Sequence, residues 1–280
     1  MTAYLRPTSL DEALALRAAH PDYAVVAGGT DLLVGALERP APAGVLDVFG
    51  VAELVGITPG PREALTVGAA TPYARLLESP RIRTTLPMLH TCVREIGAAQ
   101  IQARGTLGGN AQTCSPVGDT LPVLLALEAE VELANQAGRR RLPFAEFVTG
   151  YRQTALAADE LIVAFHFPAG LSRLRQHWRK VGTRRAQAIS KVMLAAVASL
   201  DDGTIASPRV AFGAVADRPL RIQSVEAALA GRPPSLGLAD EAAALLEQAI
   251  TPISDVRSSA DYRLQVAKNM LHRWVASLVD

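Results

Sequence analysis

The stretch from residue 104 to residue 119 most constrains what this chain can form. It reads Arg-Gly-Thr-Leu-Gly-Gly-Asn-Ala-Gln-Thr-Cys-Ser-Pro-Val-Gly-Asp, with three glycines among its first six residues, almost no charge and no helical apolar period. Glycine lacks a Cβ and permits positive φ, so successive backbone N–H groups can point into one concavity. Such a concavity suits phosphate or another anionic oxygen. The stretch therefore predicts a loop that lies against a ligand, with an ordinary tight turn as the alternative.

A second stretch of the same character lies earlier in the chain. Residues 25–33 read Val-Val-Ala-Gly-Gly-Thr-Asp-Leu-Leu, which predicts a short buried strand at 23–26 running into a double glycine. Thr30 or Asp31 is then placed to cap a short helix at 31–37. Neither stretch is the GxGxxG fingerprint or the GxxxxGK[ST] phosphate loop. We predict that the two Gly-Gly segments converge on one elongated cofactor.

Composition places the chain among soluble globular proteins of about two domains. It has 280 residues, of which 49% are apolar and 20% charged, and its net charge of +1 argues against bulk binding of nucleic acid or membrane. No apolar run is long enough to span a bilayer, and no signal peptide is recognisable, so we expect a cytoplasmic protein. Two cysteines are too few for an iron–sulfur cluster, and no ligand spacing predicts a metal site in this chain.

Periodicity and breaker residues predict the elements of the first part of the chain. A loop at 58–61 is expected to separate two lobes, and residues 100–106 are expected to be extended. Thr71 is the predicted cap of the helix that starts at Pro72. Helices are predicted at 10–19, 31–37, 72–77, 87–97 and 121–127, and strands at 23–26, 45–48, 54–57, 65–69, 130–133 and 160–167.

The second part of the chain begins near residues 168–170, where Pro-Ala-Gly breaks the pattern. A basic strand is predicted at 173–181. The apolar run at 189–200 is long enough for a helix, but the Asp-Asp-Gly turn that follows it and the next apolar run at 209–216 favour two strands. Helices are predicted at 224–230, 239–250 and 260–279, so this part reads as a small antiparallel sheet backed by helices.

An ordered set of motifs resembles the FAD-binding (medium) subunits of molybdenum hydroxylases, of the type found in xanthine dehydrogenase and carbon-monoxide dehydrogenase. The motifs are Ala-Gly-Gly-Thr-Asp-Leu at 27–32, Thr-Leu-Gly-Gly-Asn at 106–110, Ser-Pro-x-x-Asp at 115–119, Leu-Pro-Phe-Ala-Glu-Phe at 142–147, Glu-Leu-Ile at 160–162, Arg-Lys-Val-Gly-Thr-Arg-Arg at 179–185 and Tyr-Arg at 262–263. The resemblance covers essentially the whole chain.

The resemblance implies an α+β fold of two domains. The first is a two-lobed FAD-binding domain of the vanillyl-alcohol-oxidase/PCMH type at residues 1–168, with lobes at about 1–57 and 58–168. The second is a C-terminal flavoprotein domain at 171–280, built from an antiparallel sheet of about three strands and a helical bundle.

The resemblance also implies which residues hold FAD. Asp119 would repel phosphate, so we expect it to accept hydrogen bonds from ligand hydroxyls, with a cap for the helix at 121–127 as the alternative. Lys180 is expected near the flavin or its phosphates, with a surface lysine as the alternative. Ile96 and Ile162 are expected in the cofactor pocket and Ile189 near the flavin ring, and each is otherwise a core residue. The full predicted set is Val25, Val26, Ala27, Gly28, Gly29, Thr30, Asp31, Leu32, Ile96, Thr106, Leu107, Gly108, Gly109, Asn110, Thr113, Ser115, Asp119, Ile162, Lys180 and Ile189.

No nucleophile–base pair and no obvious acid or base stands out, so no catalytic residue is predicted. This fits a subunit whose flavin does the chemistry while the protein holds it. The resemblance implies that electrons come from a molybdopterin-type molybdenum cofactor on a large partner subunit, through two [2Fe-2S] clusters on a small partner subunit. They would leave FAD for an external small-molecule or NAD-type acceptor, in a dimer of heterotrimers. The substrate and the final acceptor stay open.

Three other functions are compatible with parts of this pattern. The first is a stand-alone FAD-dependent oxidoreductase of the same fold, acting directly on a small organic substrate. The second is an assembly subunit that has lost its cofactor, although its intact glycines and Asp119 argue against this. The third is an NAD-binding Rossmann domain, which would need the missing fingerprint.

Overall fold

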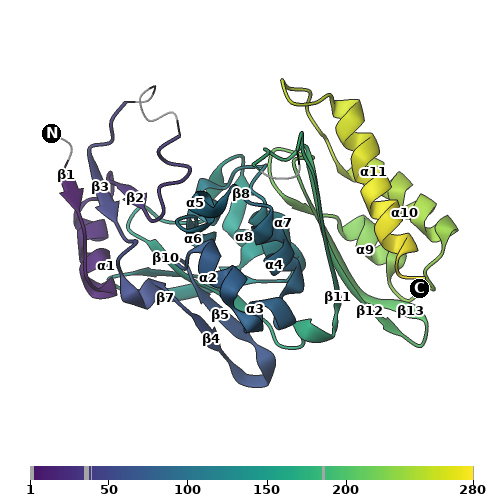
Figure 1. Cartoon of the computed structure of the whole chain (residues 1–280), viewed down its shortest axis with the longest axis horizontal. Coiled ribbons are helices and arrows are strands. Elements are labelled where there is room, and N and C mark those ends of the chain that lie inside the picture. Colours follow the sequence, from purple (N-terminus) through teal and green to yellow (C-terminus); the bar gives the residue numbers. More distant parts are fainter. Residues whose placement is uncertain (1–2, 35–37, 39, 185–186, 280) are drawn as a thin grey trace.

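The computed structural model describes residues 3–34, 38, 40–184 and 187–279. Within these residues the strands form four sheets, of three, five, four and two strands. Figure 1 shows the small N-terminal sheet at one end of the molecule, the five-stranded sheet with its helices in the middle, and the C-terminal sheet and helices at the other end. The architecture is the mixed α+β arrangement that the resemblance implies.

The N-terminal lobe is a parallel three-stranded sheet beside one helix. The strands lie in the order β1 (Ala3–Leu5), β3 (Gly44–Asp47) and β2 (Ala24–Val26). Helix α1 (Leu10–Ala19) begins where predicted, because Oγ of Ser9 accepts a hydrogen bond from the backbone N–H of Glu12. The predicted strand at 54–57 is mostly wrong, since a 3-10 turn, η1 (Ala52–Leu54), occupies its start.

The second lobe is built on an antiparallel five-stranded sheet. Its order is β4 (Ile57–Pro59), β5 (Leu65–Gly68), β10 (Leu161–Phe167), β6 (Glu130–Asn135) and β7 (Gly138–Pro143). The interpretation of 58–61 as a loop between lobes is wrong. Thr58 pairs with Thr66, and the turn η2 (Pro61–Glu63) closes a hairpin inside this sheet. Proline and glycine are common both in hairpin turns and in connections between lobes. The sequence alone therefore could not distinguish the two kinds of connection.

Helices cover one face of this sheet, and the N-terminal lobe covers the other. Two predictions fail here. Thr71 does not cap α2, since its hydroxyl bridges the N–H and C=O groups of Gly56, and residues 99–102 are helical rather than extended. The helices are α2 (Tyr73–Glu78), α3 (Pro80–Thr85), α4 (Pro87–Arg94), α5 (Ala99–Gln102), α6 (Leu107–Thr113), α7 (Thr120–Ala126) and α8 (Phe144–Phe147), and α8 is followed by the hairpin of β8 (Val148–Gly150) and β9 (Gln153–Thr154).

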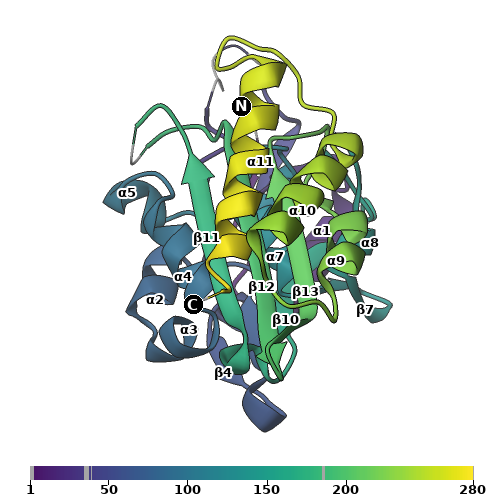
Figure 2. The ribbon, with the colours of Figure 1, turned by 90° about the vertical axis from the view of Figure 1, so that its right-hand side faces the viewer.

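The C-terminal part is an antiparallel sheet backed by three helices, as predicted. After the turn η3 (Leu171–Arg173), the strands are β11 (Arg175–Val181), β12 (Val192–Asp201), β13 (Thr204–Gly213) and the short β14 (Leu220–Arg221), which is one strand more than expected. Helices α9 (Gln223–Leu229), α10 (Leu236–Ala249) and α11 (Ala260–Ala276) cover the outer face of this sheet (Figure 2).

Strand β12 is buried on both faces, which explains the unbroken apolar run in the sequence. Met193 and Ala195 belong to the core shared with the five-stranded sheet and its helices, whereas Leu194 and Ala196 belong to the core under the C-terminal helices. Two-sided burial removes the alternation of apolar and polar residues that otherwise marks a strand.

Among the described residues, no helix combines the length and the apolar character needed to cross a membrane, and no cluster suited to holding a metal ion is found.

Candidate functional site

The first Gly-Gly segment is a half-buried turn that leaves strand β2. Gly29 has a φ of 73°, which favours glycine. A Cβ placed on Gly28 would lie 1.9 Å from the carbonyl oxygen of Arg104, so only glycine fits there. The turn continues through Leu33, whose N–H donates to the carbonyl of Gly29 at 3.1 Å, and then Val34. The rest of the helix predicted at 31–37 lies outside the described residues.

This turn presents a row of free backbone donors. Among the residues that the structure describes, no protein acceptor is found for the N–H groups of Gly28, Gly29, Thr30 and Asp31. Three of these residues are half-buried and Asp31 is exposed, so the row lies at the rim of the molecule. Consecutive free N–H groups beside glycine are suited to bind the anionic oxygens of a pyrophosphate.

The second Gly-Gly segment is the start of a helix, so the predicted loop is wrong. Thr106 caps α6, because its Oγ1 accepts a hydrogen bond from the N–H of Gly109 at 3.0 Å. The N–H of Gly108 donates to the carbonyl of Ala69 at 3.0 Å, and a Cβ on Gly108 would come within 2.7 Å of that oxygen. Both N–H groups therefore have protein acceptors, and Gly108 serves close packing of the helix against residue 69.

The first Gly-Gly segment lies against the residues that lead into the second, as convergence on one cofactor would require. Gly28 lies directly against the backbone of Arg104 and Gly105, the two residues that precede the cap of α6. Farther along, Oγ1 of Thr113 donates to Oδ2 of Asp31 at 3.2 Å and joins the far end of α6 to the turn. Leu107 points away from this junction into the core, where it is fully buried.

Beside α6, Asp119 and Lys180 form a buried ion pair. Nζ of Lys180 donates to Oδ2 of Asp119 at 2.5 Å, and the hydroxyl of Ser190 donates to Oδ1 at 2.6 Å. The side chains of Lys180 and Asp119 are 7% and 10% exposed, so the alternative of a surface lysine is wrong. Burial raises the pKa of Asp119, and the charge of Lys180 and the bond from Ser190 oppose that shift. Asp119 makes no capping bond to α7, so that alternative is wrong as well.

Hydrogen bonds hold the neighbouring helices together around this pair. Oγ1 of Thr120, the first residue of α7, donates to Oδ1 of Asn110 in α6 at 2.6 Å. Ser115 is buried between the two helices, where its Oγ accepts from the N–H of Val117 at 3.4 Å. The sequence analysis did not select Thr120, Ser190 or Arg104, because their contacts are made only when distant segments meet.

The three isoleucines of the predicted set have different environments. Ile162 is buried in β10 opposite Leu133, and Ile96 is half-buried just after α4. Ile189 is 49% exposed and directly precedes Ser190, so it is not a core residue. It lies next to the hydrogen bond between Ser190 and Asp119, and it is accessible from outside the protein.

Comparison with known proteins matches nearly the whole chain. A family model described as the FAD binding domain in molybdopterin dehydrogenase matches residues 1–170, and one described as the CO dehydrogenase flavoprotein C-terminal domain matches residues 177–278. The ion pair of Asp119 and Lys180 thus joins the two matched regions.

Relatives and solved structures agree with these two matches. The chain is 31% identical to a putative xanthine dehydrogenase FAD-binding subunit of Escherichia coli (strain K12), over 99% of this chain and 96% of that protein. It is 29% identical to the carbon monoxide dehydrogenase medium chain of Afipia carboxidovorans, over 97% and 94%. A chain of the carbon monoxide dehydrogenase from Hydrogenophaga pseudoflava superposes with a TM-score of 0.93 at 30% identity, over 97% of this chain and 95% of that one. A chain of quinoline 2-oxidoreductase from Pseudomonas putida 86 gives 0.93 at 28% identity, over 100% and 97%. This chain therefore belongs to the family of FAD-binding subunits of molybdopterin dehydrogenases.

Proposed function

We propose that this chain is the FAD-carrying electron-transfer subunit of a multi-subunit molybdenum hydroxylase. It would receive electrons from the [2Fe-2S] clusters of a small partner subunit and pass them to an external acceptor. A large partner subunit would hold the molybdenum cofactor and oxidise the substrate. The observation that carries the proposal is the row of free N–H groups at Gly28–Asp31, held against α6 inside a chain of the FAD-binding family.

The residues of this site fit a long ligand with an anionic centre and several hydroxyls. The free N–H groups at residues 28–31 would bind the pyrophosphate of FAD. Each oxygen of Asp119 accepts one hydrogen bond from the protein, which leaves a lone pair on each for a ligand hydroxyl. Lys180 adds a positive charge beside this position. When bound, FAD supplies one- and two-electron redox chemistry, which no side chain of this site provides.

Gly108 and Gly109 have a different role in this proposal from the one predicted. Their N–H groups already have acceptors in the protein, so they do not bind phosphate in this arrangement. Gly109 is exposed, and a Cβ there would meet only Oγ1 of Thr106, at 3.1 Å. We infer that Gly109 keeps the surface of α6 low enough for the cofactor to lie across it.

The assembly and the location belong to the proposal. We infer a heterotrimer with the large and small subunits, arranged as a dimer of heterotrimers in the cytoplasm. We also keep residues 1–168 and 171–280 as the two domains, with lobes at about 1–57 and 58–168, although the sheet of the second lobe already begins at Ile57, the first residue of β4. The final acceptor is a small molecule of the NAD type or another carrier, and the molybdenum subunit sets the substrate.

Two measurements test this function. The purified chain, incubated with FAD and desalted, should retain flavin absorption near one equivalent. A colourless protein would remove the basis of the proposal. The chain purified under native conditions should then bring two other subunits with molybdenum, iron and flavin in fixed ratio. Turnover of an organic substrate by the isolated FAD-loaded chain would instead assign it as a stand-alone oxidoreductase.

A further inference from the structure

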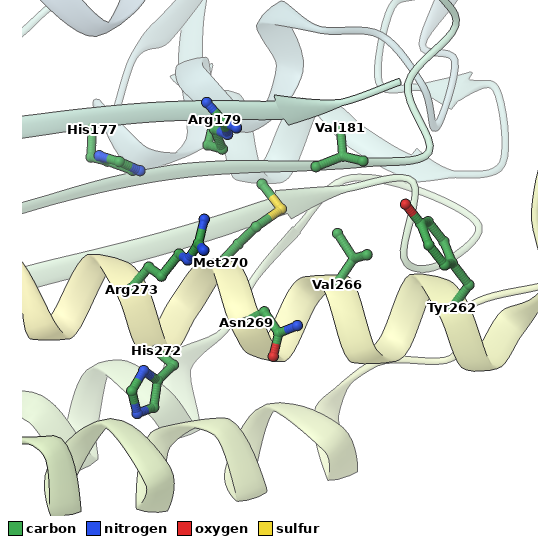
Figure 3. Close-up of a pocket in the computed structure, with 9 residues that line it drawn as sticks. All are labelled: His177, Arg179, Val181, Tyr262, Val266, Asn269, Met270, His272 and Arg273. Atoms are coloured by element: carbon green, nitrogen blue, oxygen red, sulfur yellow. The ribbon is translucent and has the colours of Figure 1, made fainter. Parts of the chain in front are cut away.

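Two neighbouring residues of helix α11, Tyr262 and Arg263, hold Lys191 at both of its ends. Nη1 of Arg263 donates to the carbonyl oxygen of Lys191 at 2.6 Å. The ammonium group of Lys191 lies over the ring of Tyr262, 5.1 Å from the ring centroid. Figure 3 shows Tyr262 extending from α11 toward the end of the strand that carries Val181. The Tyr-Arg pair is one of the motifs that resemble the FAD-binding subunits, yet neither residue belongs to the candidate cofactor site.

Other acceptors hold the guanidinium group of Arg263 in one place. The residue is buried, with 2% of its surface exposed. Nη1 also donates to the carbonyl of Ala214 at 3.3 Å, and Nη2 donates to Oδ1 of Asp255 at 2.8 Å. Ala214 is anchored in turn, because its N–H donates to the carbonyl of Pro116 at 2.9 Å. A planar guanidinium with bonds on several sides cannot rotate without breaking one of them, so its bond to Lys191 has a fixed direction.

Strand β11 separates α11 from the candidate cofactor site, because side chains alternate along a strand. The even-numbered side chains bond to residues of the first region: Gln176 to Thr85, Trp178 to Glu95 and Lys180 to Asp119. The odd-numbered ones line a groove beside α11 (Figure 3): His177, Arg179 and Val181. Arg263 therefore acts across the strand by bonding to backbone at its end, where Lys191 lies.

Lys191 connects this contact to the candidate cofactor site. Its N–H donates to the carbonyl of Val181 at 2.8 Å and joins the end of β11 to the start of β12. Ser190 directly precedes Lys191, and its hydroxyl donates to Oδ1 of Asp119. Lys180 directly precedes Val181, and its ammonium group donates to Oδ2 of the same carboxylate. A shift of the Lys191 peptide would thus move a residue that orients Asp119.

We propose that Arg263 is a positioning residue for the cofactor site, which acts through the carbonyl of Lys191 to hold Ser190 against Asp119. Tyr262 supports the same arrangement by holding the side chain of Lys191. With both contacts in place, the carboxylate of Asp119 keeps one orientation toward a ligand hydroxyl. This inference rests on the proposed function, since it takes Asp119 as a residue that binds FAD.

The test compares Arg263→Met with Arg209→Met as a matched control. Arg209 is also buried, at 8% exposed, and it also donates to a carboxylate, but its acceptor Glu128 is not part of the candidate site. Both variants should unfold at lower urea concentration than the wild type. FAD affinity is measured by flavin fluorescence at a temperature where every variant is folded. Arg263→Met should bind FAD about 10-fold more weakly, whereas Arg209→Met should bind it as the wild type does.

A double-mutant cycle with Ser190→Ala separates positioning from a general loss of stability. If Arg263 acts through the Ser190 hydroxyl, Arg263→Met should change FAD affinity by less than about 2-fold once that hydroxyl is gone. The visible circular dichroism of the bound flavin should change in Arg263→Met and stay unchanged in Arg209→Met. Tyr262 is 44% exposed, so Tyr262→Leu leaves the fold intact if Arg263→Met does not fold. It should weaken FAD binding by about 3-fold, and only while Ser190 is present.

Two kinds of failure can be told apart. Wild-type affinity in Arg263→Met and Tyr262→Leu would overturn the positioning role and leave the proposed function intact. An equal loss of affinity with serine or alanine at position 190 would also overturn it, because the effect would not pass through Ser190. A wild-type chain that does not retain FAD would overturn both the positioning role and the proposed function.

Discussion

The ammonium group of Lys180 lies 2.5 Å from Oδ2 of Asp119, in a position where both side chains are almost fully buried. A buried ion pair contributes little net stability, but removing one partner leaves the other charged and desolvated. Because the two residues come from the two regions matched by separate family models, their pairing ties the candidate cofactor site to the arrangement of both regions.

Replacing Lys180 by methionine should therefore destabilise the FAD-free protein by about 3–5 kcal/mol, since Asp119 stays buried without its cation. The double variant D119N/K180M loses both charges and should be less destabilised than K180M alone. Urea unfolding of the wild type and the variants measures the difference. A double variant that is less stable than K180M would contradict this account.

The deficit of K180M should also depend on pH, with a definite sign. Burial raises the pKa of Asp119, and losing the cation raises it further. A carboxyl whose pKa is higher in the folded state contributes stability that is full below its unfolded pKa and is lost as pH rises through the folded value. K180M should thus approach the wild type in stability toward pH 4 and fall behind it toward pH 7. Thermal melting across this range tests the trend, and a constant deficit would argue against it.

The close approach of Gly28 to Arg104 gives a prediction with a matched control. A Cβ on Gly28 would lie 1.9 Å from the carbonyl of Arg104, so Gly28→Ala should displace the turn and weaken FAD binding by at least 10-fold. Gly237 in α10 has nothing within 4 Å of its Cβ position, so Gly237→Ala should leave FAD binding unchanged and stabilise the chain by about 0.5–1 kcal/mol. Quenching of flavin fluorescence reports the affinity. Equal affinities for the two variants would mean that the turn does not hold the cofactor.

The cap of α6 is the next feature open to test. Thr106→Ala removes the acceptor of the Gly109 N–H and should cost about 1 kcal/mol of stability, whereas Thr106→Ser keeps the oxygen and should be close to the wild type. Loss of the cap should also loosen α6 where it meets the Gly-Gly turn and reduce FAD retention after desalting. Chemical denaturation and flavin absorption separate the two effects. If the serine variant is as unstable as the alanine variant, the hydroxyl is not acting as a cap.

Acid stability should depend on Glu160 and Arg140. The hydrogen bond from Arg140 lowers the pKa of Glu160, against the opposing effect of burial. A carboxyl with a lowered pKa in the folded state contributes stability that is present above its unfolded pKa and is lost as pH falls through the folded value. Glu160→Gln should therefore cost about 1–2 kcal/mol at pH 7, a figure reduced because Arg140 is half-exposed, and should cost less below about pH 4. Unfolding at pH 7 and pH 3.5 would show whether the difference shrinks as expected.

Long periodic segments of the fold could be predicted from the sequence, and short ones could not. The apolar run before the Asp201–Gly203 turn could be predicted as a strand, although its length also allows a helix. The turn and the next apolar run together indicate a hairpin, and the structure has that hairpin. The helical start at Leu107 was missed because glycines occupy positions where a helix usually shows apolar residues. Close backbone packing against Ala69 replaces side-chain burial there, and no local pattern reports it.

Candidate site residues could be selected from the sequence where the residue type by itself suggests contact with a ligand. The glycines at 28 and 29 and the carboxylate of Asp119 stand out in the sequence. The structure places both near α6, since Gly28 touches the residues before its cap and Asp119 adjoins Thr120, which bonds to Asn110. Ser190 and Arg104 do not stand out, because serine and arginine occur widely and their roles arise from contacts across distant segments. Which N–H groups remain free also depends on tertiary packing, so the unequal roles of the two Gly-Gly segments were not visible in the sequence.

The alternation along β11 has a consequence for how this subunit tolerates change. One run of seven residues faces the candidate cofactor site and the helices beside it with its even-numbered members, and faces α11 with its odd-numbered ones. Point replacements can therefore alter either surface alone, whereas deleting one residue near Arg175 would exchange the two sets and send Lys180 outward. The packing against the first region and the packing against α11 can thus drift independently by substitution, yet a single lost codon in this strand would disrupt both at once.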